Sequence, residues 1–441
     1  MRALLLAATL FDWNSDLTHL ANEVPKLHPN PYHVTARETY VAEIEQLRKR
    51  VSDLAPHEVI VEMTRIVALI GDGHTRLTLP LDPAAGFFQG HSKTDPPKDP
   101  SLLFHAIPQR FTIEDDGLFT TDGRRVTRIG RMSAAEAIAA VLPIAHGDNE
   151  WQKREVVAGY LAVPEVLHAR GVIERLGDVP LELEDVGTGF SPSDGLKPVS
   201  TLKAVSTSEP WSYRVQGDAM IFELNEVANG KTETLAQFAE RLFDAVEAQP
   251  VNKLIIDLRN NYGGNNSLNR SVLHGLIRAR KLQQPGSLFV LVGRRTFSAA
   301  MSLVVALEQN TNAIFIGEPT GGSPNSYGDS RRIKLPDSGI TVRVSTLYWQ
   351  KSDPRDKRTA LEPHVRSRDP LAVALDYFGG TPGPAEGSWK GVVTIEHERR
   401  PFTLQDGKFS LDYPFAVRAG TKRLAGTMTA NGMEWLVTAE R

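Results

Sequence analysis

The chain contains no cysteine. This absence excludes a cysteine nucleophile, disulfide bonds and thiolate metal ligands. The chain also lacks a run of about 18 apolar residues, so we expect no membrane-spanning helix. Neither sign of charge dominates, since 50 Lys and Arg stand against 53 Asp and Glu, for a formal net charge of −3. This balance gives no indication of a nucleic-acid partner, which favours a clearly basic domain.

With 441 residues, of which 41% are hydrophobic, the chain is long enough for two or three globular domains. The segment Met1–Phe11 combines one positive charge with a short apolar run. It fits either the core of a secretory signal or the first apolar turn of a helix. The first interpretation implies a periplasmic or secreted protein and the second a cytoplasmic one.

Residues 12–82 are predicted to form a helical N-terminal domain. Apolar residues recur three or four positions apart, as on one face of a helix, at Tyr40, Ile44, Leu47, Val51 and Leu54, and again at Val59, Met63, Ile66, Val67 and Ile70. Between these helices and the chain start, Leu27-His28-Pro29-Asn30-Pro31 predicts a turn, because proline cannot continue a helix. Alternation at Leu77, Leu79 and Leu81 predicts a strand.

The rest of the chain divides into three parts by pattern. Residues 83–200 mix short strands and helices, with a helix start predicted at Ser133-Ala134-Ala135-Glu136. Residues 201–378 alternate apolar strands with helices, which is typical of a βαβ sheet in an α/β fold. Gly379–Gly387 is rich in Gly and Pro and predicts a linker, and residues 388–441 predict a small all-β module with turns at Asp406-Gly407 and Asn431-Gly432.

The most informative motif is Gly293-Arg294-Arg295-Thr296-Phe297-Ser298-Ala299-Ala300-Met301, at the junction of an apolar strand and an Ala-rich helix. The Ser298 hydroxyl at such a junction lies beside free backbone N–H groups and the positive end of the helix dipole. An oxyanion formed by attack on a carbonyl carries the charge that these groups stabilise. A plain helix cap is the alternative, since serine is a favoured N-cap residue.

Two further features accompany Ser298. The segment Asp257–Asn265 runs from a buried strand into Gly263-Gly264, where an N–H group is predicted to complete an oxyanion hole with that of Ala299. The alternative is that this segment is an ordinary strand-to-helix turn that forms no oxyanion hole. His74 lies in Gly71-Asp72-Gly73-His74-Thr75, and its neutral ring is a candidate general base, with activity rising through a pKa near 6 to 7. The alternative is that His74 is a packing or surface residue, as most lone histidines are.

Together these stretches resemble one family, the C-terminal-processing and tricorn-core serine peptidases. The resemblance rests on DLRNNYGG at 257–264, GRRTFSAAM at 293–301, IGEPTGG at 316–322 and LPDSGI at 335–340, with LHPNPYH at 27–33 and LIGDGHT at 69–75 upstream. It covers roughly residues 13–378. It implies a crotonase-like, tail-specific-protease core with a helical N-terminal domain, and a serine endopeptidase whose nucleophile is Ser298.

The resemblance favours the tricorn branch. The processing branch uses a lysine in a Thr-x-Gly-Lys-Gly type segment, but Pro319–Pro324 contains no lysine. In the tricorn branch a histidine of the helical part is the base, and His74 matches it. Gly73 occupies the position at which the tricorn branch has a serine. The glutamate that the tricorn branch has near the end of the core has no clear counterpart in this sequence. Asp353, Asp356 and Glu362 all remain candidates for the carboxylate that orients His74.

The family often carries a PDZ-like domain, of which residues 101–145 resemble a remnant. The expected partner is a peptide or unfolded protein substrate, and the oligomeric state is not predicted. No His, Asp and Glu cluster has metal-ligand spacing, so we expect no metal and no cofactor. Two other functions stay open. One is a serine esterase or acyl hydrolase, and the other is a non-catalytic protein that binds a lipophilic ligand or a peptide on the same fold.

Overall fold

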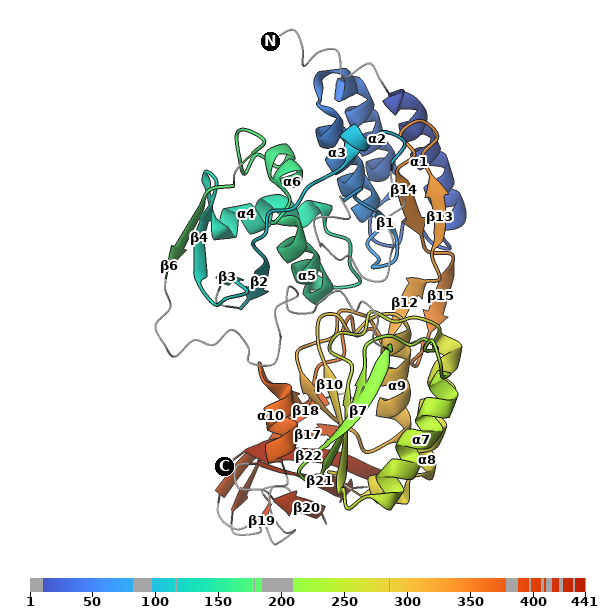
Figure 1. Ribbon diagram of the computed structural model, residues 1–441, viewed down its shortest axis with the longest axis vertical. Helices are drawn as coiled ribbons and strands as arrows, with labels where there is room; N and C mark the ends of the chain where they lie inside the picture. Colours follow the sequence, from blue (N-terminus) through green and yellow to red (C-terminus); the bar gives the residue numbers. More distant parts are fainter. Residues whose placement is uncertain are drawn as a thin grey trace. The chain divides into compact units, whose positions relative to one another are not determined.

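A computed structural model describes residues 11–81, 97–115, 117–177, 179–184, 209–284 and 286–377, together with the strand residues between 388 and 440 that are given below (Figure 1). The chain forms two compact units. Unit 1 contains the described residues up to 184 and returns for residues 321–359, and unit 2 contains the remainder. The four predicted domain boundaries stay predictions.

Unit 1 begins with three helices, α1 (Trp13–Leu27), α2 (Arg37–Arg50) and α3 (Pro56–Ala68). Their apolar faces meet in one core, to which α1 contributes Leu17 and Leu20 and α3 contributes Val59 and Ile66. Asp12 caps α1 by accepting the N–H of Ser15 at 3.1 Å. The structure confirms the helical N-terminal part.

The strand predicted at Leu77–Leu81 is short. Only β1 (Arg76–Leu77) is regular, and Leu81 forms an isolated bridge to Phe104. Pro80 lies between them and has no N–H to donate to a continuous ladder. The three leucines are nevertheless buried, as their alternation predicts.

A five-stranded antiparallel sheet with three helices follows in unit 1. Its strands are β2 (Phe111–Glu114), β3 (Gly117–Thr120), β4 (Arg125–Ile129), β5 (Met132–Ser133) and β6 (Leu181–Glu184), in the order β2-β3-β4-β5 with β6 paired to β4. The helices are α4 (Ala134–Val141), α5 (Glu150–Tyr160) and α6 (Pro164–Ala169). The predicted capping box is confirmed, since Glu136 accepts the Ser133 N–H at 2.8 Å and donates its own N–H to the Ser133 hydroxyl at 3.3 Å.

The returning segment 321–359 completes unit 1 with two β-ribbons. These are built from β12 (Asn325–Gly328), β13 (Arg331–Lys334), β14 (Thr341–Val344) and β15 (Leu347–Gln350). Strand β14 pairs with both β13 and β1, while β12 pairs with β15. Because Val342 and Val344 are buried in the core of the helices, this segment is an integral part of unit 1.

The centre of unit 2 is a six-stranded sheet in the order β16-β11-β10-β9-β8-β7. Its strands are β7 (Trp211–Gln216), β8 (Ala219–Leu224), β9 (Lys253–Asp257), β10 (Leu288–Val292), β11 (Ile314–Gly317) and β16 (Val365–Arg366). All neighbours run parallel except β7 and β8.

Helices cover both faces of this sheet, which explains its unbroken apolar strands. One face packs against α7 (Leu235–Ala248), α8 (Asn269–Arg278) and α9 (Ala299–Asn310) (Figure 1). The other face packs against α10 (Pro370–Asp376). Successive residues of β10 therefore enter different cores, with Val290 in the first and Phe289 and Leu291 in the second.

The C-terminal strands form a separate six-stranded antiparallel sheet in the order β19-β18-β17-β22-β21-β20. They are β17 (Ser388–Ile395), β18 (Glu398–Gln405), β19 (Lys408–Phe409), β20 (Phe415–Ala419), β21 (Arg423–Ala430) and β22 (Met433–Glu440). The predicted all-β module is confirmed, and with it the α/β fold class. The predicted linker 379–387 and the turns at Asp406-Gly407 and Asn431-Gly432 lie outside the described residues.

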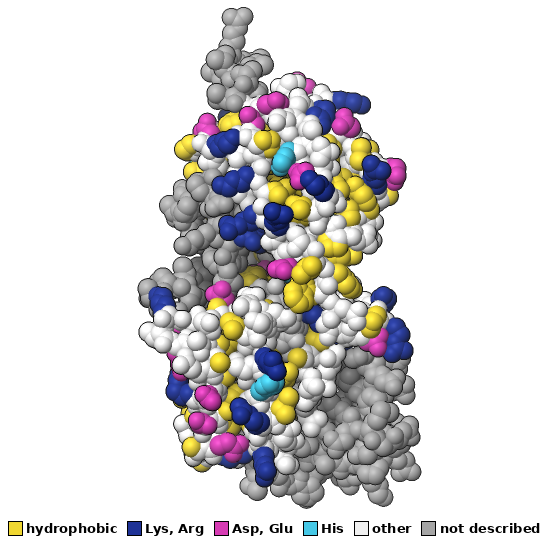
Figure 2. Space-filling view, turned by 90° about the vertical axis from the view of Figure 1, so that its right-hand side faces the viewer, with side chains coloured by type: hydrophobic (Ala, Val, Ile, Leu, Met, Phe, Trp, Pro, Cys, Tyr) yellow, Lys and Arg dark blue, Asp and Glu magenta, His cyan; other side chains and the backbone are white. Residues whose placement is uncertain are grey.

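Within the described part of the chain, no helix combines the length and the apolar character needed to cross a membrane. The segment 1–10 lies outside that part. On the face drawn in Figure 2, Lys and Arg side chains are interspersed with Asp and Glu side chains. This mixture agrees with the nearly balanced charge of the sequence.

Candidate active site

Ser298 has a backbone conformation that serine rarely adopts. It precedes α9 directly, with φ 54° and ψ −120°. Among the described residues, only Ser298 and Asp329 combine a positive φ with a side chain larger than that of glycine. An N-cap residue ordinarily has extended backbone angles and a side chain that accepts an N–H of the first turn. Ser298 makes no capping hydrogen bond, so the interpretation as a plain helix cap does not hold.

The turn before Ser298 is fixed by the neighbouring strand. The Thr296 hydroxyl donates to the Leu258 carbonyl at 2.9 Å and accepts the Gly293 N–H at 3.0 Å. The Phe297 N–H donates to the Asn261 carbonyl at 3.1 Å. These bonds tie the loop after β10 to the loop after β9, which is how a strained residue can persist.

The two glycines after β9 are required by their surroundings. Gly263 has φ 114°, and a Cβ there would lie 2.6 Å from Ser298 Cβ and 2.9 Å from the Ala299 nitrogen. Gly264 has φ 133°, and a Cβ there would lie 2.3 Å from the Val227 carbonyl oxygen. The predicted approach of this turn to Ser298 and Ala299 is therefore present in the structure.

The backbone N–H groups of this turn have different partners. The Gly263 N–H donates to the Asn261 side chain at 2.8 Å. The bridge to Val227 uses the Gly263 carbonyl and the Asn265 N–H. The Gly264 and Ala299 N–H groups take no part in these bonds, so they are better candidates for an oxyanion hole than the Gly263 N–H. The Asn269 side chain anchors the same corner by donating to the Ala299 carbonyl at 2.7 Å.

His74 lies in unit 1, in a turn organised by Asp72. Asp72 Oδ1 accepts the N–H groups of His74 and Thr75, each at 2.7 Å, and the Ser345 hydroxyl at 2.8 Å. Asp72 Oδ2 accepts His28 Nε2 at 2.9 Å. The other ring nitrogen of His28 accepts the Asn30 N–H at 3.0 Å, which fixes the tautomer with the proton on Nε2.

Asp148 is the second carboxylate beside His74. One donor atom from each of Asp72, His74 and Asp148 lies within 4.8 Å of the other two. Asp148 accepts the Gly73 N–H at 2.7 Å and the Ser323 N–H at 3.2 Å. The helical part, the α5 region and the returning segment thus meet at this turn of unit 1.

The three carboxylates considered from the sequence are engaged elsewhere. Asp353 pairs with Arg355, Asp356 with Arg358, and Glu362 with Arg366, each at 2.8 Å. Among the described residues of unit 1, Asp72 and Asp148 are the acids grouped with His74. Asp72 lies within the GDGHT stretch at 71–75, whereas Asp148 has no sequence signal that connects it to His74.

Burial dominates the electrostatics of this group. It lowers the pKa of His74 to about 3, so the ring is neutral at neutral pH. Burial, reinforced by Asp72, raises the pKa of Asp148 to about 6. Burial also raises the pKa of Asp72, but hydrogen bonds from His28 and Thr75 outweigh it and hold the pKa well below its usual range. This burial does not favour an ordinary pKa near 6 to 7 for His74, and the rise of activity through such a pKa stays a prediction.

A lysine with a lowered pKa, which no sequence motif indicates, belongs to the same surroundings. Burial lowers the pKa of Lys351 to about 8, and its ammonium group donates to the Ser326 hydroxyl at 2.7 Å. Its charge also contributes to the low pKa of His74. Lys351 follows β15 in the returning segment, and nothing in its local sequence distinguishes it from a surface lysine.

Two groups of side chains in the described residues have donor atoms close enough to hold a metal ion. One is Asp72, His74 and Asp148, and the other is His57, Glu58 and His168. Both join segments far apart in the sequence, so ligand spacing along the chain could not reveal them. Ser298 lies in unit 2 and His74 in unit 1, and the predicted separation of about 3 Å between them stays a prediction.

Comparison with known proteins adds a family. The model of peptidase family S41 matches residues 267–367, a stretch that includes Ser298. No curated protein matches the chain. Among solved structures, a CPAF mutant is 11% identical, with a TM-score of 0.55, and the match covers 85% of this chain and 96% of that chain.

A second structure, mature CPAF complexed with lactacystin, is 12% identical, with a TM-score of 0.50, over 82% of this chain and 94% of that chain. At these identities the likeness shows a shared fold. The resemblance inferred from the sequence motifs is thus confirmed independently by the family match over residues 267–367. The chain is similar to peptidase family S41 over residues 267–367 and is a serine-type peptidase.

Proposed function

We propose that this chain is a serine endopeptidase in which Ser298 attacks the peptide carbonyl and His74 is the general base. The observation that carries the proposal is the strained backbone of Ser298, with φ 54° and ψ −120°, between β10 and α9. Strain of this kind costs about 1–3 kcal/mol and is concentrated at functional sites. A strained strand-to-helix turn is also the device by which other hydrolases present a serine nucleophile.

In the first step, the Ser298 oxygen bonds to the carbonyl carbon while its proton passes to the neutral His74 ring. The carbonyl oxygen becomes an oxyanion, and the Gly264 and Ala299 N–H groups are its proposed donors. Collapse of this intermediate breaks the C–N bond, and His74 returns the proton to the leaving amine. Water then hydrolyses the acyl-enzyme by the same steps, and Ser298 regains its proton.

The surroundings of His74 bear on its assigned role in two ways. Burial keeps the ring neutral at neutral pH, which is the form that can accept the serine proton, but a pKa lowered to about 3 also makes the ring a weak base, which the reaction must offset by stabilising the imidazolium. Asp72 receives the His74 N–H and so fixes the backbone that carries the ring. Asp148 and Asp72 are the carboxylates available to stabilise the imidazolium that forms during the reaction. The proposal requires the His74 ring to come within hydrogen-bond distance of the Ser298 hydroxyl in the reacting enzyme.

The test combines a fluorophosphonate probe with a peptide-library digest and an ester panel. The wild-type chain should be labelled at Ser298, and Ser298→Ala should lose both labelling and peptide cleavage. His74→Ala should reduce kcat about 10³-fold or more, and adding it to Ser298→Ala should change little, because the two residues act as a unit. Cleavage of esters but no peptide would make the chain an acyl hydrolase instead.

Lys351→Gln is the matched comparison for the identity of the base. It removes the amine of lowered pKa from the same group of residues. If Lys351→Gln abolishes activity while His74→Ala retains most of it, the base is the lysine and the assignment of His74 is wrong. If Ser298→Ala keeps full peptidase activity, the nucleophile is another residue.

A further inference from the structure

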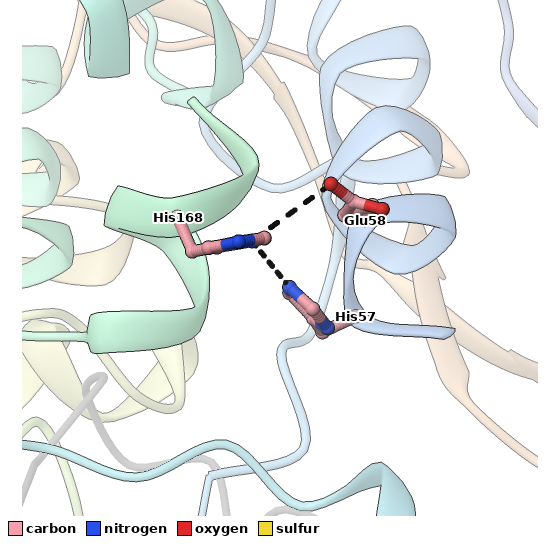
Figure 3. A group of neighbouring side chains, drawn as sticks. All are labelled: His57, Glu58 and His168. Atoms are coloured by element: carbon pink, nitrogen blue, oxygen red, sulfur yellow. Dashed lines mark hydrogen bonds and ion pairs between the residues drawn. The ribbon is translucent and has the colours of Figure 1, made fainter. Parts of the chain in front are cut away.

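His57, Glu58 and His168 form a compact group of side chains on two helices of unit 1 (Figure 3). His57 and Glu58 lie in the first turn of α3, and His168 lies in the last turn of α6. The His57 Nε2 atom is 3.0 Å from His168 Nδ1, and that same Nδ1 is 3.8 Å from Glu58 Oε1. Three donor atoms of the kinds that bind transition metals therefore converge on one point.

From this convergence we propose that His57, Glu58 and His168 bind a zinc ion. Zinc prefers imidazole nitrogen and carboxylate oxygen at about 2.0–2.2 Å in tetrahedral geometry, which places its ligand atoms roughly 3.3 Å apart. The two measured separations, 3.0 and 3.8 Å, lie on either side of that value. Small side-chain rotations would bring all three donors to the ion, and water would supply the fourth ligand.

Glu58 is already held in the required orientation. Its Oε2 atom accepts the Ala55 N–H at 2.7 Å, at the start of α3. This leaves Oε1 as the oxygen on the side of His168. The side chains of His168 and Glu58 are 26% and 27% exposed, so an ion can reach the group from solvent without a change of fold.

The helices that carry the ligands are firmly packed. Val59 and Ile60 follow Glu58 on α3, Val166 and Leu167 precede His168 on α6, and all four side chains are fully buried in the same core. Ligands on such rigid elements lose little conformational freedom when the ion binds.

The charges around the group suit a divalent cation. Glu58 supplies a negative charge to the group, and the negative charge of Glu165 also acts on His57. The Glu165 carboxylate is itself paired with His105 Nδ1 at 2.7 Å.

A bound ion would join positions 111 residues apart in the sequence. It would fasten α3 against α6, and α3 is the helix that leads into the turn holding Asp72 and His74. The ion would therefore link these two helices, apart from the chemistry proposed for Ser298.

The experiment titrates zinc into the full chain after treatment with a chelator. Calorimetry should give about one tight site per chain, and Tm should rise with zinc because only the folded chain holds the three ligands together. His57→Gln, His168→Gln and Glu58→Gln should each weaken binding about 100-fold or more, by loss of a ligand. Glu58→Gln keeps the capping bond to Ala55, since glutamine also accepts it.

Three comparisons make the result decisive. His274→Gln, which removes an exposed histidine of α8 in unit 2, should leave zinc binding unchanged. His74→Ala should also retain it, because that variant disturbs only the other candidate group. Co²⁺ should give the visible spectrum of a four-coordinate site in the wild type and lose it in Glu58→Gln. In the presence of chelator, each variant should have a Tm close to that of the wild type.

Two results would overturn the proposal. One is loss of the tight site in His74→Ala with no change in the three ligand variants, which would assign the metal to the Asp72 group. The other is the absence of any tight site in the folded wild-type chain, which would leave His57 and His168 as a hydrogen-bonded histidine pair. Neither result bears on labelling of Ser298, so the proposed peptidase mechanism is tested separately.

Discussion

The backbone at Ser298 stores conformational energy that a plain helix start would not need. A positive φ brings the Cβ of an L-residue close to its own backbone, and glycine alone avoids this cost. The residue keeps this conformation because Thr296 and Phe297 hold the preceding turn to the loop after β9. The strained backbone at Ser298 therefore lowers the stability of the fold while it holds the Ser298 side chain in a fixed position.

Replacing Ser298 should therefore separate stability from activity. Ser298→Ala keeps the strain, whereas Ser298→Gly relieves about 1–3 kcal/mol of it, offset by about 0.5–1 kcal/mol for the greater freedom of glycine in the unfolded chain. We expect both variants to be inactive and the glycine variant to be at least as stable as the alanine variant in urea unfolding. A glycine variant clearly less stable than Ser298→Ala would show that the backbone is not strained.

The pH dependence of activity should reflect the buried surroundings of His74. With its pKa lowered to about 3, the ring stays neutral and able to accept a proton well below pH 6. An inflection of kcat/KM near pH 6 would instead belong to Asp148, whose pKa is raised to about 6, and should disappear in Asp148→Asn. An inflection near pH 6.5 that persists in Asp148→Asn would contradict this and indicate an exposed histidine base.

The same shifts act on stability in opposite directions. The unfolded chain protonates His74 near pH 6.5, but the folded chain does so only near pH 3. Stability from this residue is therefore present above about pH 6.5 and is lost as pH falls towards 3. Asp148, with its raised pKa, contributes stability at low pH that is lost as pH rises through about 6.

At the scale of elements, the site in unit 2 is a meeting of two strand-to-helix turns. The parallel strands β9 and β10 are neighbours, so the loops at their carboxyl ends are neighbours too. Only a residue without a side chain fits between Ser298 and the β9 loop, as the contact of 2.6 Å for a Cβ at Gly263 shows. Gly263 therefore sets how closely this loop, with its proposed oxyanion donor, approaches Ser298, the proposed nucleophile.

Gly263→Ala should displace Ser298 and reduce kcat by about 10²-fold, since a shift of about 1 Å in a reacting group has that effect. Gly217→Ala is the matched control. It also has a positive φ, 61°, in the turn between β7 and β8, but a Cβ there meets no atom within 4 Å. Both variants should be somewhat destabilised in thermal unfolding, and only Gly263→Ala should lose activity. Equal losses of activity would mean that backbone strain, and not contact with Ser298, is responsible.

At the scale of the whole molecule, unit 1 is discontinuous in sequence. The chain leaves it, forms most of the sheet of unit 2, returns for residues 321–359 and leaves again. The returning segment supplies Leu335, Ile340, Val342 and Val344 to the core of the helices, all of them buried. It also supplies the backbone N–H groups of Asp337 and Ser338 that the buried Asp16 accepts.

A fragment that ends near residue 206 should therefore fail to fold cooperatively. Each missing side chain contributes about 1.5–3 kcal/mol of burial, so the loss of four is comparable with the whole stability of a domain, about 5–15 kcal/mol. The control is the same fragment with residues 321–359 joined by a Gly/Ser linker, which should unfold cooperatively. If the shorter fragment unfolds as sharply as the longer one in denaturant, the returning segment is dispensable.

The sequence by itself determined the local elements and indicated Ser298 as the proposed nucleophile. The 3.6-residue spacing before residue 70 predicts helices because it places apolar side chains on one face, and that face is buried in α2 and α3. The apolar runs at β9 and β10 predict strands covered on both faces. The family resemblance rested on short stretches around Gly263 and Ser298, where the chemistry itself requires particular residues in a local turn.

The tertiary structure alone decided which side chains surround His74 and what their charges are. Asp148 and Lys351 reach that turn from segments far away in the sequence, and periodicity carries no information on such contacts. The low pKa of His74 likewise follows from burial by the whole of unit 1. The tertiary structure likewise decided the strain at Ser298 and the grouping of His57, Glu58 and His168. They depend on packing between elements, which a pattern along one strand or helix does not specify.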